Sequence, residues 1–291
     1  MTRIDDMLTA YPGKPVFLCD YSPPKGADFA TIDRVISTGC NCVLVAYSPG
    51  KSVRVDSAVA AHLIQKQSGK EVMFTLSCRD MNKLAIQSHL LGAQLLDVEN
   101  VLVLQGDRFT SDELIFMKEV RDFRPTELIR SIKEMNQGID FRGKKLRVPT
   151  SFCVGAIIDL QNKSINQEVK LTLKKIESGA DFFITQTFFN VEKATDFLKT
   201  FVSYSGEPFP KPIFYGLPIL TQDGLIFGDV PEKLMADLNR GKTGMEIALE
   251  QLHSYVNNGM FGIYIVPPIQ KGGRRDYESV SELIREFSET H

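Results

Sequence analysis

Two short apolar runs in this sequence end in side chains whose chemistry suits the recognition of a small molecule. The first ends in Gln105, Gly106 and Asp107, and the second, 182–185, ends in Gln186. Each run is short and apolar, which is typical of a strand buried on both faces. A glycine at a strand tip lets a planar ligand approach the backbone, while the carboxylate and the amides supply acceptors and donors there. This layout predicts a small-molecule site and indicates an enzyme.

Other predicted strands also end in or just before polar side chains, which are Asp20, Tyr47, Ser77, Asp159 and Tyr264. The set contains carboxylates and other polar side chains that can hydrogen-bond to the edge of a ring, but no paired nucleophile and base. This disfavours serine-hydrolase and metal-hydrolase chemistry. The four histidines are scattered, and no second pair of ligands completes a tetrahedral site beside Cys40 and Cys42. We therefore expect no metal site.

These residues must be positioned by an alternation of short apolar and longer amphipathic segments. Strands are predicted at 16–20, 42–47, 72–77, 101–105, 151–157, 182–186, 213–216 and 262–266. Helices are predicted at 29–37, 57–67, 81–98, 126–136, 167–178, 191–201, 231–257 with a break near Gly241, and 277–288. The alternation fits a single (β/α)8 TIM barrel domain over residues 1–291, whose polar strand ends converge at one face. A doubly wound sheet is the alternative, but the G-x-G-x-x-G loop of that fold is missing.

Helical spacing predicts which side chains pack on the barrel. In helix 81–98 one face carries Met81, Leu84, Ser88, Leu91 and Leu95. In helix 167–178 the predicted core face is Val169, Leu173 and Ile176, with Glu168, Leu171 and Lys175 on another face. On pattern alone, the pair Lys174 and Lys175 is as compatible with a solvated helix surface as with a binding role.

Two loops lie beside the predicted site. The irregular stretch 108–124 directly follows the strand tip at Gly106 and Asp107, which predicts a lid or a cofactor-holding loop over the catalytic face. The segment 271–275, with sequence KGGRR, follows the last strand. It could meet a phosphate or a glutamate tail, and a solvated turn is an equal alternative.

The overall composition is that of an ordinary globular protein. The chain has 291 residues with a net charge of −2 and 43% hydrophobic residues. Without a basic field we expect no affinity for nucleic acid or anionic membranes. The N-terminal sequence lacks a signal-peptide pattern, no apolar run is long enough to span a bilayer, and the five cysteines are odd in number. These features favour reduced thiols and a cytoplasmic location.

Three motifs resemble the methylenetetrahydrofolate reductase family, whose members are FAD-containing (β/α)8 barrels. They are residues 20–26 (DYSPPKG), residues 76–82 with 100–107 (LSCRDMN and NVLVLQGD), and residues 179–189 (GADFFITQTFF). The resemblance runs from the first strand to about residue 190 and continues more weakly to Tyr264. Its second and third motifs are specific, and together they are hard to explain by barrel periodicity alone.

The resemblance implies a role for each matching residue. Asp20 matches the acid that protonates the departing folate nitrogen, Asp107 the pterin-binding aspartate near the flavin, and Gln186 a glutamine that contacts folate and nicotinamide. Tyr264 lies on the strand that helps to bind substrate. FAD would be contacted by Tyr47, Ser77, Gln105, Gly106, Asp107 and Ile157 on strand ends, and by Glu168, Lys174 and Lys175 on the helix. NADH or NADPH would serve as electron donor or acceptor.

The implied reaction interconverts 5,10-methylene- and 5-methyl-tetrahydrofolate by hydride transfer through FAD. A carboxylic acid is needed because the departing nitrogen must be protonated when the ring opens. Asp20 is one methylene shorter than the family glutamate, Gln105 replaces a frequent arginine, and the ending after Tyr264 is apolar. These departures leave open the identity of the electron donor and the direction of reaction. It is also open whether the substrate is folate or a related C1 carrier such as a tetrahydromethanopterin.

Two other functions remain as alternatives. The chain could be a pterin- or flavin-binding subunit that needs a partner protein for electron transfer, or a corrinoid-linked pterin methyltransferase barrel. If NADH or NADPH bleached the bound flavin without a partner protein, the first alternative would be excluded. Absence of flavin would favour the second. A homo-oligomer is compatible with the sequence, which carries no interface signature.

Overall fold

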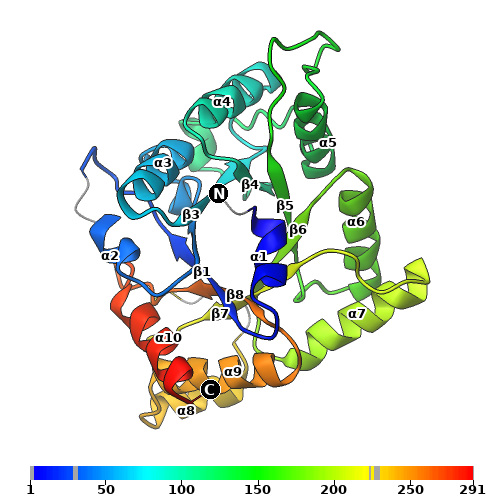
Figure 1. Ribbon diagram of the computed structural model, residues 1–291. Coiled ribbons are helices and arrows are strands. Elements are labelled where there is room, and N and C mark those ends of the chain that lie inside the picture. The colour runs from blue at the N-terminus through cyan, green and yellow to red at the C-terminus, as the bar shows by residue number, and fades with distance from the viewer. Residues whose placement is uncertain (1–2, 29–31, 223, 226–229, 291) are drawn as a thin grey trace.

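The protein is a closed barrel of parallel strands surrounded by helices, as predicted (Figure 1). The structure, a computed structural model, describes residues 3–28, 32–222, 224–225 and 230–290. The strands follow the chain order around the barrel, and β1 pairs with β8 to close it. They are β1 Val16–Tyr21, β2 Cys42–Val45, β3 Glu71–Ser77, β4 Asn100–Leu104, β5 Cys153–Ile158, β6 Phe182–Thr187, β7 Ile213–Pro218 and β8 Gly262–Val266. Nearly every strand residue is buried, because the barrel interior and the helical ring cover both faces.

The helices lie outside the strands in chain order (Figure 1). They are α2 Ile32–Ile36, α3 Ser57–Ser68, α4 Lys83–Leu95, α5 Pro125–Asn136, α6 Ile165–Glu177, α7 Val191–Ser205, α8 Glu232–Asn239, α9 Gly244–Asn257 and α10 Glu278–Thr290. Side-chain caps fix several helix starts, since Asp56, Asn82 and Ser164 each accept a backbone N–H from the first turn. The break predicted near Gly241 is confirmed by the separation of α8 from α9. The first three residues of predicted helix 29–37 lie outside the described residues.

An additional helix, α1 Ile4–Ala10, was not predicted, and it closes the N-terminal end of the barrel (Figure 1). Ile4 and Met7 pack into the cluster that fills the barrel interior. The Ile4 N–H donates to Asn100 Oδ1 at 3.2 Å, and Asn100 Nδ2 donates to the Val72 carbonyl at 3.1 Å. The helix is short and its apolar residues are few, so its sequence pattern is too weak to predict it.

Alternate residues of each strand point into the barrel and form this interior cluster. Leu18, Leu44, Leu102, Ile184 and Phe214 are among its members. In β5 the inward position is Gly155, and a Cβ there would overlap the Phe182 ring. Glycine therefore makes room for an aromatic side chain on the neighbouring strand.

The packing faces of two helices differ from the prediction. In α4 the buried residues are Ile86, Gln87, Leu90 and Ala93, whereas Leu84 is 61% and Leu95 86% exposed. In α6 the predicted core face is confirmed, since Val169 is buried and Leu173 and Ile176 pack against the core, but Glu168 and Lys175 are buried as well. Apolar spacing alone misses such positions, because hydrogen-bonded polar side chains can occupy a buried face too.

No helix within the described residues is both long enough and apolar enough to cross a membrane.

Candidate functional site

Side chains of alternate strand residues point into the barrel, and this pattern brings three of the predicted polar residues to its C-terminal mouth. Asp20 lies two residues beyond the interior residue Leu18, and Gln186 lies two beyond Ile184. Tyr264 packs directly against the interior cluster. These side chains come from β1, β6 and β8, so only closure of the barrel could place them at one opening.

Asp20 is buried and held by two neighbours. The Tyr264 hydroxyl donates to Asp20 Oδ1 at 2.8 Å, and Arg275 Nη2 lies 2.8 Å from Asp20 Oδ2. Burial, and then the adjacent Asp20 carboxylate, raise the pKa of Tyr264 well above its usual value, so its hydroxyl stays protonated and donating. This role of Arg275 was not predicted, because nothing in the segment 271–275 distinguishes a buried arginine from a solvated one.

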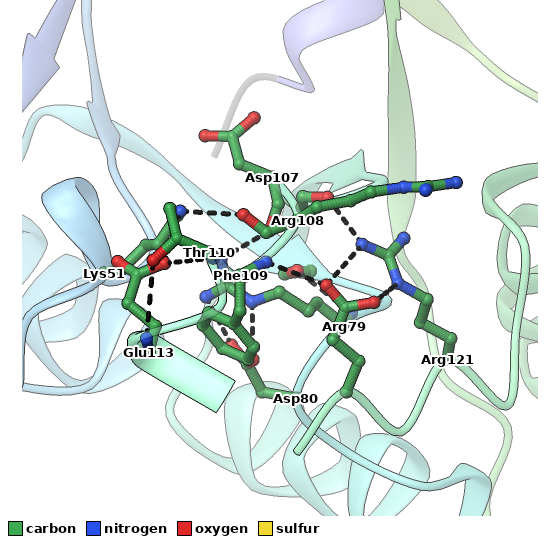
Figure 2. Close-up of polar contacts among 12 residues, drawn as sticks. Lys51, Arg79, Asp80, Asp107, Arg108, Phe109, Thr110, Glu113 and Arg121 are labelled. Atoms are coloured by element: carbon green, nitrogen blue, oxygen red, sulfur yellow. Dashed lines mark hydrogen bonds and ion pairs between the residues drawn. The ribbon is translucent and has the colours of Figure 1, made fainter. Parts of the chain in front are cut away.

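The turn after β4 presents Asp107 to the mouth. Gly106 has φ +78°, and a Cβ at this position would overlap Ser77 Oγ and lie 2.8 Å from Arg79 Cβ. Glycine is therefore required both by the backbone conformation and by the space. The Asp107 carbonyl accepts from Arg79 Nη1 at 3.0 Å, while its carboxylate points away from the surrounding contacts (Figure 2). Among the described residues, no side chain bonds that exposed carboxylate, which leaves it available for a ligand.

Arg79 and Asp80, which follow β3, form the base on which this turn rests. Arg79 Nε and Nη2 donate to the two Asp80 oxygens at 2.6 and 2.9 Å, a bidentate pair. The guanidinium also lies 4.3 Å from the ring centre of Phe109, close enough for a cation–π contact. Burial and the nearby Asp80 carboxylate raise the pKa of Tyr47, which keeps this half-buried phenol protonated. No role was predicted for the side chains of Arg79, Asp80 or Phe109, although Arg79 and Asp80 lie within the motif 76–82.

The irregular stretch 108–124 is confirmed as a loop, with one short 3-10 turn, η2 Glu113–Ile115. Lys51, in the 3-10 turn η1 Pro49–Lys51 after β2, donates to the Arg108 carbonyl at 2.7 Å and pairs with Glu113 at 2.8 Å. The Phe109 N–H donates to Glu119 Oε1 at 2.9 Å. Interactions at both ends therefore hold the loop beside the strand tip that carries Asp107.

The three predicted residues on α6 divide into a buried pair and an exposed lysine. Lys175 Nζ donates to the Ile157 carbonyl at 2.5 Å and lies 3.6 Å from Glu168 Oε1. Glu168 in turn accepts from the Asp159 N–H at 3.2 Å. Burial lowers the pKa of Lys175 although Glu168 opposes the shift. Lys174 is exposed on the helix surface.

The chemistry of these groups fits the ring end of FAD. Tyr47, Ser77, Gly106 and Ile157 lie at the ends of the adjacent strands β2 to β5, where a planar ring could lie across backbone edges. Gln105 is exposed at the same tip. For the phosphates, Lys174 is exposed and available, whereas Lys175 is bonded to the strand end.

The amino-acid sequence matches a protein family over most of its length. The model of the family described as methylenetetrahydrofolate reductase matches residues 3–264. A probable methylenetetrahydrofolate reductase (NADPH) from Caenorhabditis elegans is 24% identical over 265 residues, which cover 85% of this chain and 34% of that protein. A probable methylenetetrahydrofolate reductase (NADH) from Oryza sativa subsp. japonica is 26% identical over 189 residues, covering 62% and 31%.

Solved structures share the same fold. An uncharacterized protein from Clostridium thermocellum, described as binding two copies of 5-methyl-5,6,7,8-tetrahydrofolic acid, superposes with a TM-score of 0.71. It is 13% identical, and the superposition covers 99% of this chain and 100% of that one. A 2,3-dimethylmalate lyase, also 13% identical, has a TM-score of 0.55. This chain spans only about a third of the length of the curated relatives named above.

Proposed function

The chain belongs to the methylenetetrahydrofolate reductase family, and we propose that it is a flavin-dependent oxidoreductase that interconverts 5,10-methylene- and 5-methyl-tetrahydrofolate. The observation that carries the proposal is the convergence of Asp20, Gln186 and Tyr264 on one barrel mouth, beside the free carboxylate of Asp107. A folate substrate is also supported by the similarity to a structure described as holding methyltetrahydrofolate.

In this proposal Asp20 is the acid–base group. Opening the imidazolidine ring breaks a C–N bond, and the departing nitrogen must receive a proton. Asp20 lies at the mouth and is oriented by the Tyr264 hydroxyl, which donates to one carboxyl oxygen. Asp20 would give its proton to that nitrogen in the reductive direction and accept it in the oxidative direction.

Asp107 and Gln186 would hold the pterin. A pterin edge carries adjacent donors and acceptors, which suit a carboxylate and an amide. Both side chains are exposed at the ends of their strands and would need no rearrangement to meet a ligand. A carboxylate beside the substrate would also favour a cationic iminium electrostatically.

FAD would be held by Tyr47, Ser77, Gln105, Gly106, Asp107 and Ile157 at its ring, and by Lys174 near its phosphates. When bound, the flavin supplies the hydride chemistry that no side chain can provide. Glu168 and Lys175 would shape this site by fixing the end of β5, with Lys175 bonded to the Ile157 carbonyl. Relatives named for NADPH and for NADH support either nicotinamide as the electron donor or acceptor.

A second candidate function is a flavin- and pterin-binding subunit that receives electrons from a partner protein. The tip of the loop 108–124 favours it, because Leu114, Ile115 and Phe116 are 50%, 76% and 86% exposed. Contiguous exposed apolar side chains beside a site are typical of a contact surface. Failure of both nicotinamides to reduce bound flavin, together with bleaching by methyltetrahydrofolate, would support this candidate.

The test of the main proposal is an absorbance spectrum of the purified, FAD-reconstituted protein, followed by anaerobic addition of methyltetrahydrofolate. We expect a flavin spectrum that bleaches on addition. A flavin that does not respond would contradict the proposed folate reaction and indicate another pterin as the substrate. A protein that stays colourless after reconstitution would contradict the proposal and favour a flavin-free pterin-binding barrel.

A further inference from the structure

The hairpin after β8 sends two consecutive arginines in opposite directions. The Gln270 N–H donates to the Arg274 carbonyl at 2.9 Å, which closes the turn. Arg274 is exposed, and its Nε donates to Gln270 Oε1 at 2.8 Å. The Arg275 side chain points inward and is only 9% exposed. Since an arginine is rarely buried without a partner, its environment requires an explanation.

Arg275 reaches across the barrel seam to the end of β1. Its Nη2 lies 2.8 Å from Asp20 Oδ2, and its Nε donates to Ser22 Oγ at 2.8 Å. Two residues further on, the Tyr277 hydroxyl accepts the Ser22 N–H at 3.3 Å. The segment after β8 therefore contacts the strand end that carries Asp20 at three points.

The Asp20 carboxyl is fixed between two groups as a result. Tyr264 engages Oδ1 from inside the barrel, while Arg275 lies against Oδ2 from the loop. Burial lowers the pKa of Arg275, but Asp20, with smaller contributions from Tyr277 and Tyr264, more than offsets it, so the net pKa is raised and the guanidinium keeps its charge. A carboxyl held by two partners loses its freedom to rotate, which matters because aspartate here has a short reach.

We propose that Arg275 is a positioning residue for the folate reaction, which fixes Asp20 at the orientation needed for proton transfer without contacting the substrate. This inference rests on the proposed function and adds a residue outside the three strand motifs. Arg275 stays protonated throughout, and the transferred proton passes only between Asp20 and the folate nitrogen. Misplacement of a reacting group by about 1 Å costs about 100-fold in rate.

The test compares Arg275→Met and Arg275→Lys with the matched control Arg274→Met, which removes the neighbouring exposed charge. Each FAD-reconstituted protein is mixed anaerobically with methyltetrahydrofolate, and the limiting rate of flavin bleaching is measured separately from substrate affinity. For Arg275→Met we expect the rate to fall by about 100-fold with little change in affinity. Arg275→Lys should recover part of the rate, and Arg274→Met should match the wild type.

A second measurement needs no cofactor and separates positioning from simple loss of folding. The melting temperatures of Asp20→Asn, Arg275→Met and the double variant form a cycle on the flavin-free protein. If the ion pair forms, the melting temperature of the double variant should fall by less than the sum of the two single-variant decreases.

A chemical rescue adds a third measurement, made on the FAD-reconstituted protein. For Arg275→Ala, guanidinium at low millimolar concentration should restore part of the rate of flavin bleaching, whereas urea should not.

The outcomes distinguish the two proposals. A wild-type flavin that methyltetrahydrofolate fails to bleach contradicts the proposed function. A responsive wild type with an equally fast Arg275→Met variant overturns the positioning role and leaves the function intact. Additive melting temperatures would likewise overturn it, because they would show that Arg275 and Asp20 do not interact.

Discussion

The glycine at the strand tip beside the site can be tested with one methyl group. Gly106→Ala places a Cβ at a backbone with φ +78°, where it overlaps Ser77 Oγ and comes within 2.8 Å of Arg79 Cβ. Gly69, at the end of α3, has a similar φ of +66° but no atom within 4 Å of an added Cβ. Gly69→Ala is therefore a matched control that isolates the conformational cost.

The expected losses of stability differ because only one site is crowded. The left-handed conformation costs an alanine about 1–2 kcal/mol at either position. At Gly106 the overlap adds about 1–3 kcal/mol of overpacking. Moving Ser77 away also breaks its 3.1 Å bond from the Arg79 N–H, worth about 1 kcal/mol. We expect a total loss of about 3–6 kcal/mol for Gly106→Ala and about 1–2 kcal/mol for Gly69→Ala.

Urea unfolding measures both losses, provided that the slope of unfolding free energy against urea is the same in all proteins. Methyltetrahydrofolate affinity is measured in parallel, because a displaced strand tip also displaces Asp107. We expect weaker binding only in Gly106→Ala. Equal stability losses in the two variants would refute the reasoning, since they would mean that Ser77 and Arg79 yield without cost. Replacing Ser77 by glycine in the Gly106→Ala background should recover part of the loss.

Three further predictions concern other parts of the molecule. Asp107→Asn should weaken methyltetrahydrofolate binding by about 10-fold or more, since one charge-assisted bond is worth about 1.5–3 kcal/mol. The control Asp112→Asn, on the exposed loop, should leave binding unchanged, and equal titration curves for the two variants would contradict the pterin role of Asp107. Lys175→Met should cost about 3–5 kcal/mol in urea unfolding because it leaves Glu168 buried and unpaired. Adding Glu168→Gln should reduce that loss. Folding lowers the pKa of Lys175, so as pH rises the native state releases the ammonium proton before the unfolded state does. The free energy of unfolding of the wild type, measured relative to the double variant, should therefore rise as pH approaches 10.5. Asn100→Ala should cost about 1–3 kcal/mol by leaving buried groups of Ile4 and Val72 unpaired, and an unchanged urea midpoint would contradict the bridging role.

The sequence predicted the barrel well because buried parallel strands have a distinctive local pattern. The strand ends at Asp20, Gln186 and Tyr264 could be located because each follows an apolar run, and alternation then places the side chains inside. The predicted face of α4 was wrong because Leu84 and Leu95 have the helical spacing of a core face but are exposed, while Gln87 lies on the buried face. Arg275 was missed because its burial depends on where β1 lies, and that contact crosses 255 residues of chain, which no local pattern encodes.

The Asp20–Arg275 pair also bears on when activity can arise during folding. The two residues belong to the first strand and to the segment after the last one, so they meet only when β8 closes against β1. Closing so long a loop carries an entropic cost that neighbouring-strand contacts do not. A partly folded chain with most of its strands in register would have native-like secondary structure but no ordered acid. During refolding, recovery of folate chemistry should therefore lag behind recovery of helix content, and enzymatic turnover would report ring closure.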